Sequence, residues 1–187
     1  MSIRFIIFIF AHKLIQHLTF NIQHFIMLQR IQSVFLLVAF LAVVLLFFFP
    51  MASIYQDIST SVYYKFYVYG INNTNQNEPS IFSFMTTFPL LLINIIVGVL
   101  TLAAIFLYKN RVTQMKLVRF AILLEIVMVA LIFFVYAQIV EKSLQITPNY
   151  LDEAGIYFPL VTLVFLILAN RSILKDEKLV RSVDRLR

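Results

Sequence analysis

Long apolar stretches recur along this chain, each about the length of a membrane-spanning helix. A helix rises about 1.5 Å per residue, so about 20 mostly apolar residues cross the ~30 Å hydrocarbon layer of a bilayer. Four stretches fit this length: residues 31–52, 89–108, 117–139 and 156–173. The pattern predicts an all-α membrane protein, a four-transmembrane-helix bundle over residues 27–187.

The pattern changes between the first two stretches. The segment SVYYKFYVYG, residues 61–70, is rich in tyrosine and β-branched residues and is typical of a strand. The turn-forming NNTNQNEPS follows it, and IFSFM, residues 81–85, is the candidate returning strand. We expect a small β-hairpin in the first outer loop. Two strands alone are marginal in water, so the hairpin should pack on the helix ends, where it caps the bundle or binds a partner or a glycan.

Composition supports membrane spans and removes several kinds of site. The chain is 61% hydrophobic and 13% charged, with a mean hydropathy of +0.91. It has no cysteine, which excludes disulfides, thiol redox chemistry and cysteine-based metal sites. The three histidines are His12, His17 and His24, so no span offers an imidazole. We expect no metal, no cofactor and, for want of paired catalytic groups, no enzymatic activity.

The basic residues lie on one side of the predicted membrane. Thirteen of the 15 Lys and Arg fall on one side: eleven before the first span, between the second and third, or after the fourth, and two, Arg119 and Arg171, at the adjoining ends of the third and fourth spans. The other two, Lys65 and Lys142, fall in the remaining loops. Cytoplasmic loops carry the excess of Lys and Arg, so both termini should be cytoplasmic and residues 53–88 should lie outside.

The tail, residues 174–187, holds much of this charge. Its apolar residues recur at helical spacing, which predicts an amphipathic helix that continues the fourth span along the membrane surface. Basic residues there favour anionic lipid headgroups, by about 1 kcal/mol each near the surface. The alternative is a docking helix for a cytosolic protein. Nucleic acid is not an expected partner, because no folded basic domain is present.

The N-terminal extension, residues 1–26, differs from the rest of the chain. Its apolar start is too short to span, and no small-residue cleavage site follows it. Three interpretations stay open for this extension: a signal peptide, an interfacial amphipathic helix, or a segment that is not native because translation starts at Met27.

Three segments carry a resemblance to a known family: MLQRIQSVFLLVAFLAVVLLFFFP, AIFLYKNRVTQMKLVRFAILL and LANRSILKDEKLVRSVDRLR. Over Met27–Arg187 the chain resembles a family of small four-span membrane proteins of Bacteroidota, domain-of-unknown-function family 4293. The resemblance implies a multi-pass protein of the bacterial cytoplasmic (inner) membrane. It carries over no catalytic residue.

One charged residue lies inside a predicted span. Glu125 has apolar neighbours on both sides, and a carboxylate at that depth costs about 2.5–3.5 kcal/mol on insertion scales. Counting inward from the charged span ends puts Glu125, Thr101 and Thr162 at one depth, roughly 12–14 Å in. Asn94 shares a small, polar helical face with Thr101. We therefore predict an intramembrane polar cluster of Glu125, Thr101, Thr162 and Asn94, with Glu125 in hydrogen-bonding reach of Thr101 or Thr162.

Two functions fit these features. The first is a non-enzymatic assembly or accessory subunit, whose outer hairpin or tail meets an unidentified protein partner and in which Glu125 joins helices by a hydrogen bond. The alternative is a small proton-coupled transporter or channel that uses Glu125. Glu125 joining helices is the simpler interpretation, because no span holds a second acidic residue or a cation at that depth.

Overall fold

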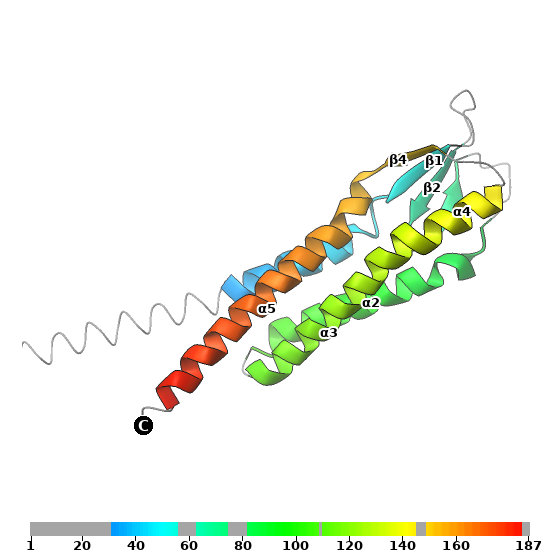
Figure 1. The fold of residues 1–187 in the computed structure, drawn as a ribbon. Coiled ribbons are helices and arrows are strands. Elements are labelled where there is room, and N and C mark those ends of the chain that lie inside the picture. The colour runs from blue at the N-terminus through cyan, green and yellow to red at the C-terminus, as the bar shows by residue number, and fades with distance from the viewer. Residues whose placement is uncertain (1–30, 56–62, 75–81, 109, 145–148, 185–187) are drawn as a thin grey trace, which may run out of the picture.

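A computed structural model describes residues 31–55, 63–74, 82–108, 110–144 and 149–184. Its helices run side by side along one axis, and a small sheet lies at one end of them (Figure 1). The N-terminal extension, residues 1–26, lies outside the described residues.

Three helices are long and apolar enough to cross a membrane. The first is α2, Phe84–Phe106. The second is the continuous helix Arg111–Ser143, which is built from α3, Arg111–Ala130, η1, Leu131–Tyr136, and α4, Ala137–Leu144. The third lies within α5, Tyr157–Asp184. A further apolar helix, Ile31–Leu45, is shorter over the described residues.

Each helix buries one face against its neighbours. In the Ile31–Leu45 helix the buried positions recur at three- and four-residue spacing, the period of a helix face. α3 packs between α2 and α5. The Ile31–Leu45 helix contacts α2 where the side chain of Asn94 reaches the Val43 carbonyl, and it contacts α5 where the rings of Phe35 and Phe165 lie 6.1 Å apart. The four helices thus enclose one interior.

The sheet has four antiparallel strands in the order β3-β2-β1-β4. The strands are β1, Ala52–Tyr55; β2, Tyr63–Tyr67; β3, Gly70–Asn73; and β4, Asn149–Asp152. A hairpin is present in the first outer loop, as β2 and β3, but it turns within the predicted first strand and its second strand lies nearer in the sequence than expected. It is stabilised by β1 and β4, which extend it beyond the marginal two-stranded form.

Several predicted boundaries differ from the observed ones. Residues 82–85 are not a returning strand: β3 takes that place, and α2 begins at Phe84, where the Ser83 hydroxyl accepts from the Met85 N–H as a helix cap. The first helix ends at Leu45, and the chain then turns and enters β1 at Ala52. Strand β4 was not predicted. The tail is helical and continues the fourth apolar stretch, as expected, over its described part, because α5 runs unbroken through Asp184.

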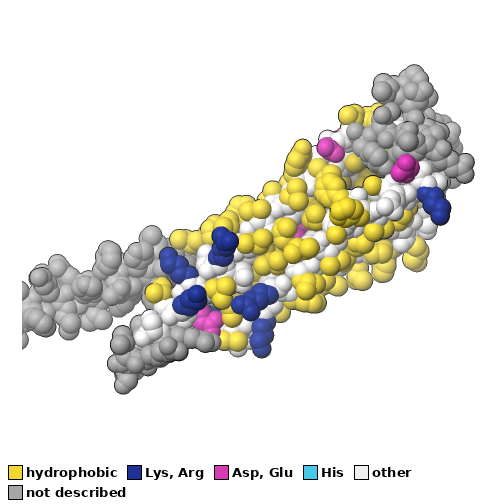
Figure 2. Space-filling view, in the orientation of Figure 1, with side chains coloured by type: hydrophobic (Ala, Val, Ile, Leu, Met, Phe, Trp, Pro, Cys, Tyr) yellow, Lys and Arg dark blue, Asp and Glu magenta, His cyan; other side chains and the backbone are white. Residues whose placement is uncertain are grey.

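Charge is distributed unevenly along the bundle. Lys and Arg side chains gather near the end opposite the sheet, and hydrophobic side chains cover the middle (Figure 2). The basic residues at that end belong to the start of α3 and the second half of α5. This distribution is typical of a membrane protein with one basic face.

Candidate functional site

Glu125 lies on the interior face of α3. The buried residues of this helix are Gln114, Val118, Ala121, Glu125 and Met128, which repeat at the spacing of one helical face. The Glu125 side chain is 0% exposed. Neither of its carboxyl oxygens has a hydrogen-bond partner within the described part of the chain. A fully buried carboxyl group without a partner is costly and rare.

Two hydrogen bonds set the register between α3 and α2. Near one end of the pair, the Gln114 side-chain amide donates to the Ala104 carbonyl at 2.9 Å. Near the sheet, the Tyr136 hydroxyl donates to the Thr86 carbonyl at 2.5 Å. Glu125 is midway between Gln114 and Tyr136, and the position midway between Ala104 and Thr86 is 95. Counting the same number of residues from each bond reaches positions 93 and 97, so the level of Glu125 falls within this stretch of α2, which contains Asn94 and Val97.

A contact at the tail end sets the level of Thr162. The Arg111 guanidinium donates to the backbone carbonyl of Asp176 at 3.4 Å. α3 and α5 run antiparallel. The number of residues from Arg111 to Glu125 on α3 equals the number from Asp176 back to Thr162 on α5. These equal separations agree with the predicted level of Thr162, which is 1% exposed.

Asn94 is tied to the first helix. Its side-chain amide donates to the Val43 carbonyl at 3.4 Å, and its own side-chain oxygen is buried without a partner among the described residues. One turn further along α2, Gly98 allows close approach to the same helix, since a Cβ there would lie 3.2 Å from Val43 Cγ1. This small face matches the helix interface expected from the sequence.

Thr101 lies further along α2, toward Ala104. Its distance from positions 93–97 is about 6–12 Å along the helix axis, at about 1.5 Å per residue. It is fully buried, and its hydroxyl donates to the Val97 carbonyl of its own helix at 2.7 Å. The expected hydrogen bond between Glu125 and Thr101 or Thr162, all of which the structure describes, is not formed, because both Glu125 oxygens lack a partner there. The common depth of Glu125, Thr101 and Thr162 stays a prediction.

The buried polar atoms of this region lack partners. Within the described chain, two oxygens of Glu125 and one of Asn94 are buried without a donor. An ionised carboxylate there would carry an uncompensated buried charge, whereas a protonated carboxyl group is neutral and brings its own donor. The arrangement suits the binding of a proton, or of a small cation that accepts oxygen ligands. Among the described residues, no group of three or more His, Cys, Asp or Glu could hold a metal ion.

A second buried polar contact lies near the end of the bundle opposite the sheet. The sequence analysis did not predict it. The Gln32 side-chain amide donates to the carboxylate of Asp176, and both residues are at most 5% exposed. The available signal was periodicity: each of these polar residues occupies a position in the buried stripe of its helix. This contact joins the Ile31–Leu45 helix to α5.

Comparison with known proteins gives one family. The family model described as domain of unknown function (DUF4293) matches residues 28–186. No curated protein matches the chain.

Proposed function

The chain belongs to the DUF4293 family, and from that premise we propose that it is a multi-pass protein of the bacterial cytoplasmic membrane that moves protons, alone or coupled to a small solute, by way of Glu125. Three long apolar helices and the basic end of the bundle support the membrane placement. Glu125 supports the activity.

The single observation that carries the proposal is the fully buried carboxyl group of Glu125 with both oxygens unpartnered in the described chain. A glutamate that only joins helices would do so through a hydrogen bond across the interface. Glu125 makes no such bond within the described residues. Intramembrane carboxyl groups that face a bundle interior mark proton and ion pathways in many membrane proteins.

The surroundings of Glu125 are compatible with its side chain gaining and losing a proton. In this proposal the carboxyl group lies near Asn94 and Thr162, and the unpartnered Asn94 oxygen serves as an acceptor for a protonated Glu125. Losing the proton would leave a buried, unpaired charge, which favours uptake of another proton or a cation. Glu125 is in this proposal the group that binds and releases the transported proton.

The test compares Glu125→Gln with the matched control Glu141→Gln, which changes an exposed carboxylate of α4. Glutamine keeps the shape of the side chain but cannot release a proton. Each protein is reconstituted into vesicles that hold a pH-sensitive dye, and proton uptake is driven by an imposed membrane potential. We expect the natural protein and Glu141→Gln to take up protons and Glu125→Gln to fall to the rate of protein-free vesicles. Uptake by Glu125→Gln at the natural rate would contradict the role of Glu125, and no uptake by the natural protein would contradict the transport of protons alone.

A second function, an assembly or accessory subunit, is favoured by the sheet. Its edge strands, as far as the structure describes the chain, are β3 and β4, and Leu151 on β4 is 56% exposed. An open edge is a template for a strand of another protein. Purification from native membranes in mild detergent separates the two functions: a stoichiometric partner that is lost in Leu151→Lys supports the subunit, and proton flux by the chain alone supports the carrier.

A further inference from the structure

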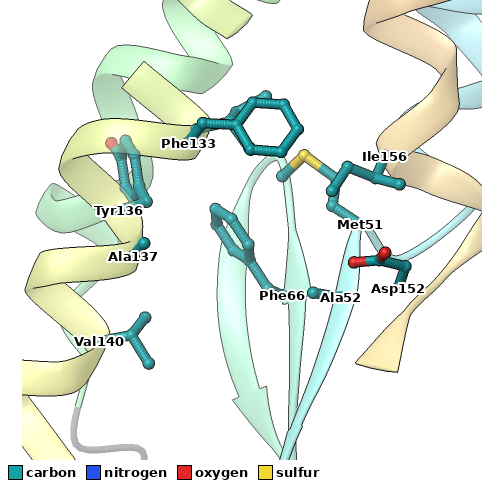
Figure 3. Close-up of a pocket in the computed structure, with 10 residues that line it drawn as sticks. Met51, Ala52, Phe66, Phe133, Tyr136, Ala137, Val140, Asp152 and Ile156 are labelled. Atoms are coloured by element: carbon teal, nitrogen blue, oxygen red, sulfur yellow. The ribbon is translucent and has the colours of Figure 1, made fainter. Parts of the chain in front are cut away.

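A cavity of about 190 Å³ lies between the sheet and the helix that faces it (Figure 3). Its floor is a row of residues across three strands. Ala52 of β1 pairs with Phe66 of β2 on one side and with Asp152 of β4 on the other. Directly paired residues point to the same face of a sheet, so these three side chains lie in line under the cavity.

The opposite wall is the helical segment η1 and the start of α4. Ile132, Phe133, Tyr136, Ala137 and Val140 line the cavity from there. η1 is a π-helix, a rare form that occurs frequently at functional sites. The Tyr136 ring stacks on Phe66 with centroids 5.5 Å apart, and its hydroxyl bonds the Thr86 carbonyl. These contacts hold the wall over the floor.

The size and lining of the cavity select its occupant. Pockets for drug-sized ligands measure about 300–1,000 Å³, so this cavity suits one slender chain. Its lining is apolar except for Tyr136, whose hydroxyl is already bonded, and Asp152, which is exposed at the rim. Phe133, at the other side of the lining, is 49% exposed on the apolar helix surface. The cavity thus extends from Phe133, on the apolar helix surface that would face the bilayer, to the Asp152 carboxylate at its rim.

We propose that this cavity binds a phospholipid with an amine headgroup, as in phosphatidylethanolamine, and that it takes part of one acyl chain. The surrounding bilayer supplies the chain at high local concentration where the apolar helices end. The ammonium group lies against the Asp152 carboxylate, which disfavours an anionic headgroup without an amine. This site is separate from Glu125 and does not depend on the proposed transport.

The chain contains no tryptophan, which allows a direct test. Phe133→Trp places a single tryptophan at the cavity. Phe134→Trp is the matched control, since the neighbouring side chain is 71% exposed and does not line the cavity. The full-length variants are reconstituted with phosphatidylethanolamine or phosphatidylglycerol, each brominated on the acyl chain. Bromine quenches the fluorescence of a tryptophan that the chain contacts, and competition between the lipids gives their relative affinity.

We expect Phe133→Trp to favour phosphatidylethanolamine roughly two- to five-fold, the range that one exposed ion pair contributes. Phe134→Trp should give a ratio near one. Adding Asp152→Asn to Phe133→Trp should bring the ratio to one with quenching retained, because the chain still enters. Adding Ala137→Phe, which fills the cavity, should remove the preference as well. A ratio near one in Phe133→Trp, or a preference that survives either added change, would overturn the proposal.

Discussion

Gly155 shows how one position without a side chain holds two segments together. Its N–H donates to the Pro50 carbonyl at 2.9 Å, just where the chain enters β1. A Cβ on residue 155 would lie 2.6 Å from the Phe49 carbonyl oxygen and closer still to that of Pro50. These are backbone atoms, which cannot rotate away as a side chain can.

We expect Gly155→Ala to destabilise the fold by about 1–3 kcal/mol, the cost of overpacking, or more because backbone must move. Thermal unfolding in detergent would show this as a midpoint several degrees lower. Gly70→Ala is the control, since a Cβ there meets only a side-chain atom of Asn72 at 3.7 Å. Equal midpoints for the two variants would show that the Pro50 segment adapts without cost.

The burial of Glu125 could be predicted from the sequence. Which residues lie at the same depth as Glu125 could be predicted only in part. The depth count used Lys and Arg as markers of the membrane boundary, and long basic side chains reach out from variable depths. That count predicts Thr162 at the level of Glu125, and the equal residue separations from the Arg111–Asp176 contact agree with it. The depth of Thr101 stays a prediction, because the register between α2 and α3 depends on how far Gln114 and Tyr136 reach across to α2. No spacing in the sequence states that register.

Between elements, the contact of Gln32 with Asp176 joins the Ile31–Leu45 helix to α5. The backbone carbonyl of Asp176 also accepts a hydrogen bond from the Arg111 guanidinium of α3. Three helices therefore meet at Asp176. We expect Asp176→Ala to cost about 1–3 kcal/mol, because it leaves the buried Gln32 amide without an acceptor.

The comparison that checks this uses two further variants. Asp176→Asn keeps a side-chain oxygen and should retain most of the stability, while Lys178→Ala changes an exposed residue and should stay within about 0.5 kcal/mol. Unfolding midpoints in one detergent rank the three proteins. If Asp176→Ala unfolds together with Lys178→Ala, the contact contributes nothing to stability.

The helices could be predicted as elements because hydropathy summed over the length of a whole span is a strong signal, but the strands at their ends could not. An apolar run before a turn does not distinguish a buried strand from the last turns of a helix, so Ala52 was assigned to the first span. Pro50, which lacks an N–H and disfavours helix in the residue before it, was the sign of the break. β4, NYLD, has no apolar alternation; its pairing with β1, from a distant part of the chain, makes it a strand.

For the whole molecule, the sheet limits the topology. β1, β2 and β3 come from the chain between the first helix and α2, and β4 comes from the chain between α4 and α5. Because these strands form one sheet, both connections lie on the same side of any membrane that the helices cross. α2 then runs away from the side that holds the sheet, and the antiparallel Arg111–Ser143 helix runs back to it.

The charge distribution predicts on which side of the membrane the sheet lies. Thirteen of the 15 Lys and Arg belong to segments expected on the side opposite the sheet, which should therefore be cytoplasmic. The chain has no cysteine, so single cysteines report their own positions. With a membrane-impermeant maleimide, Asn72→Cys and Leu151→Cys should be labelled in intact cells, since both positions lie on the sheet. Ser182→Cys, in the last turns of α5, should be labelled only after the membrane is opened. Labelling of Ser182→Cys in intact cells would contradict the orientation, and labelling of only one of the two sheet positions would contradict the sheet itself.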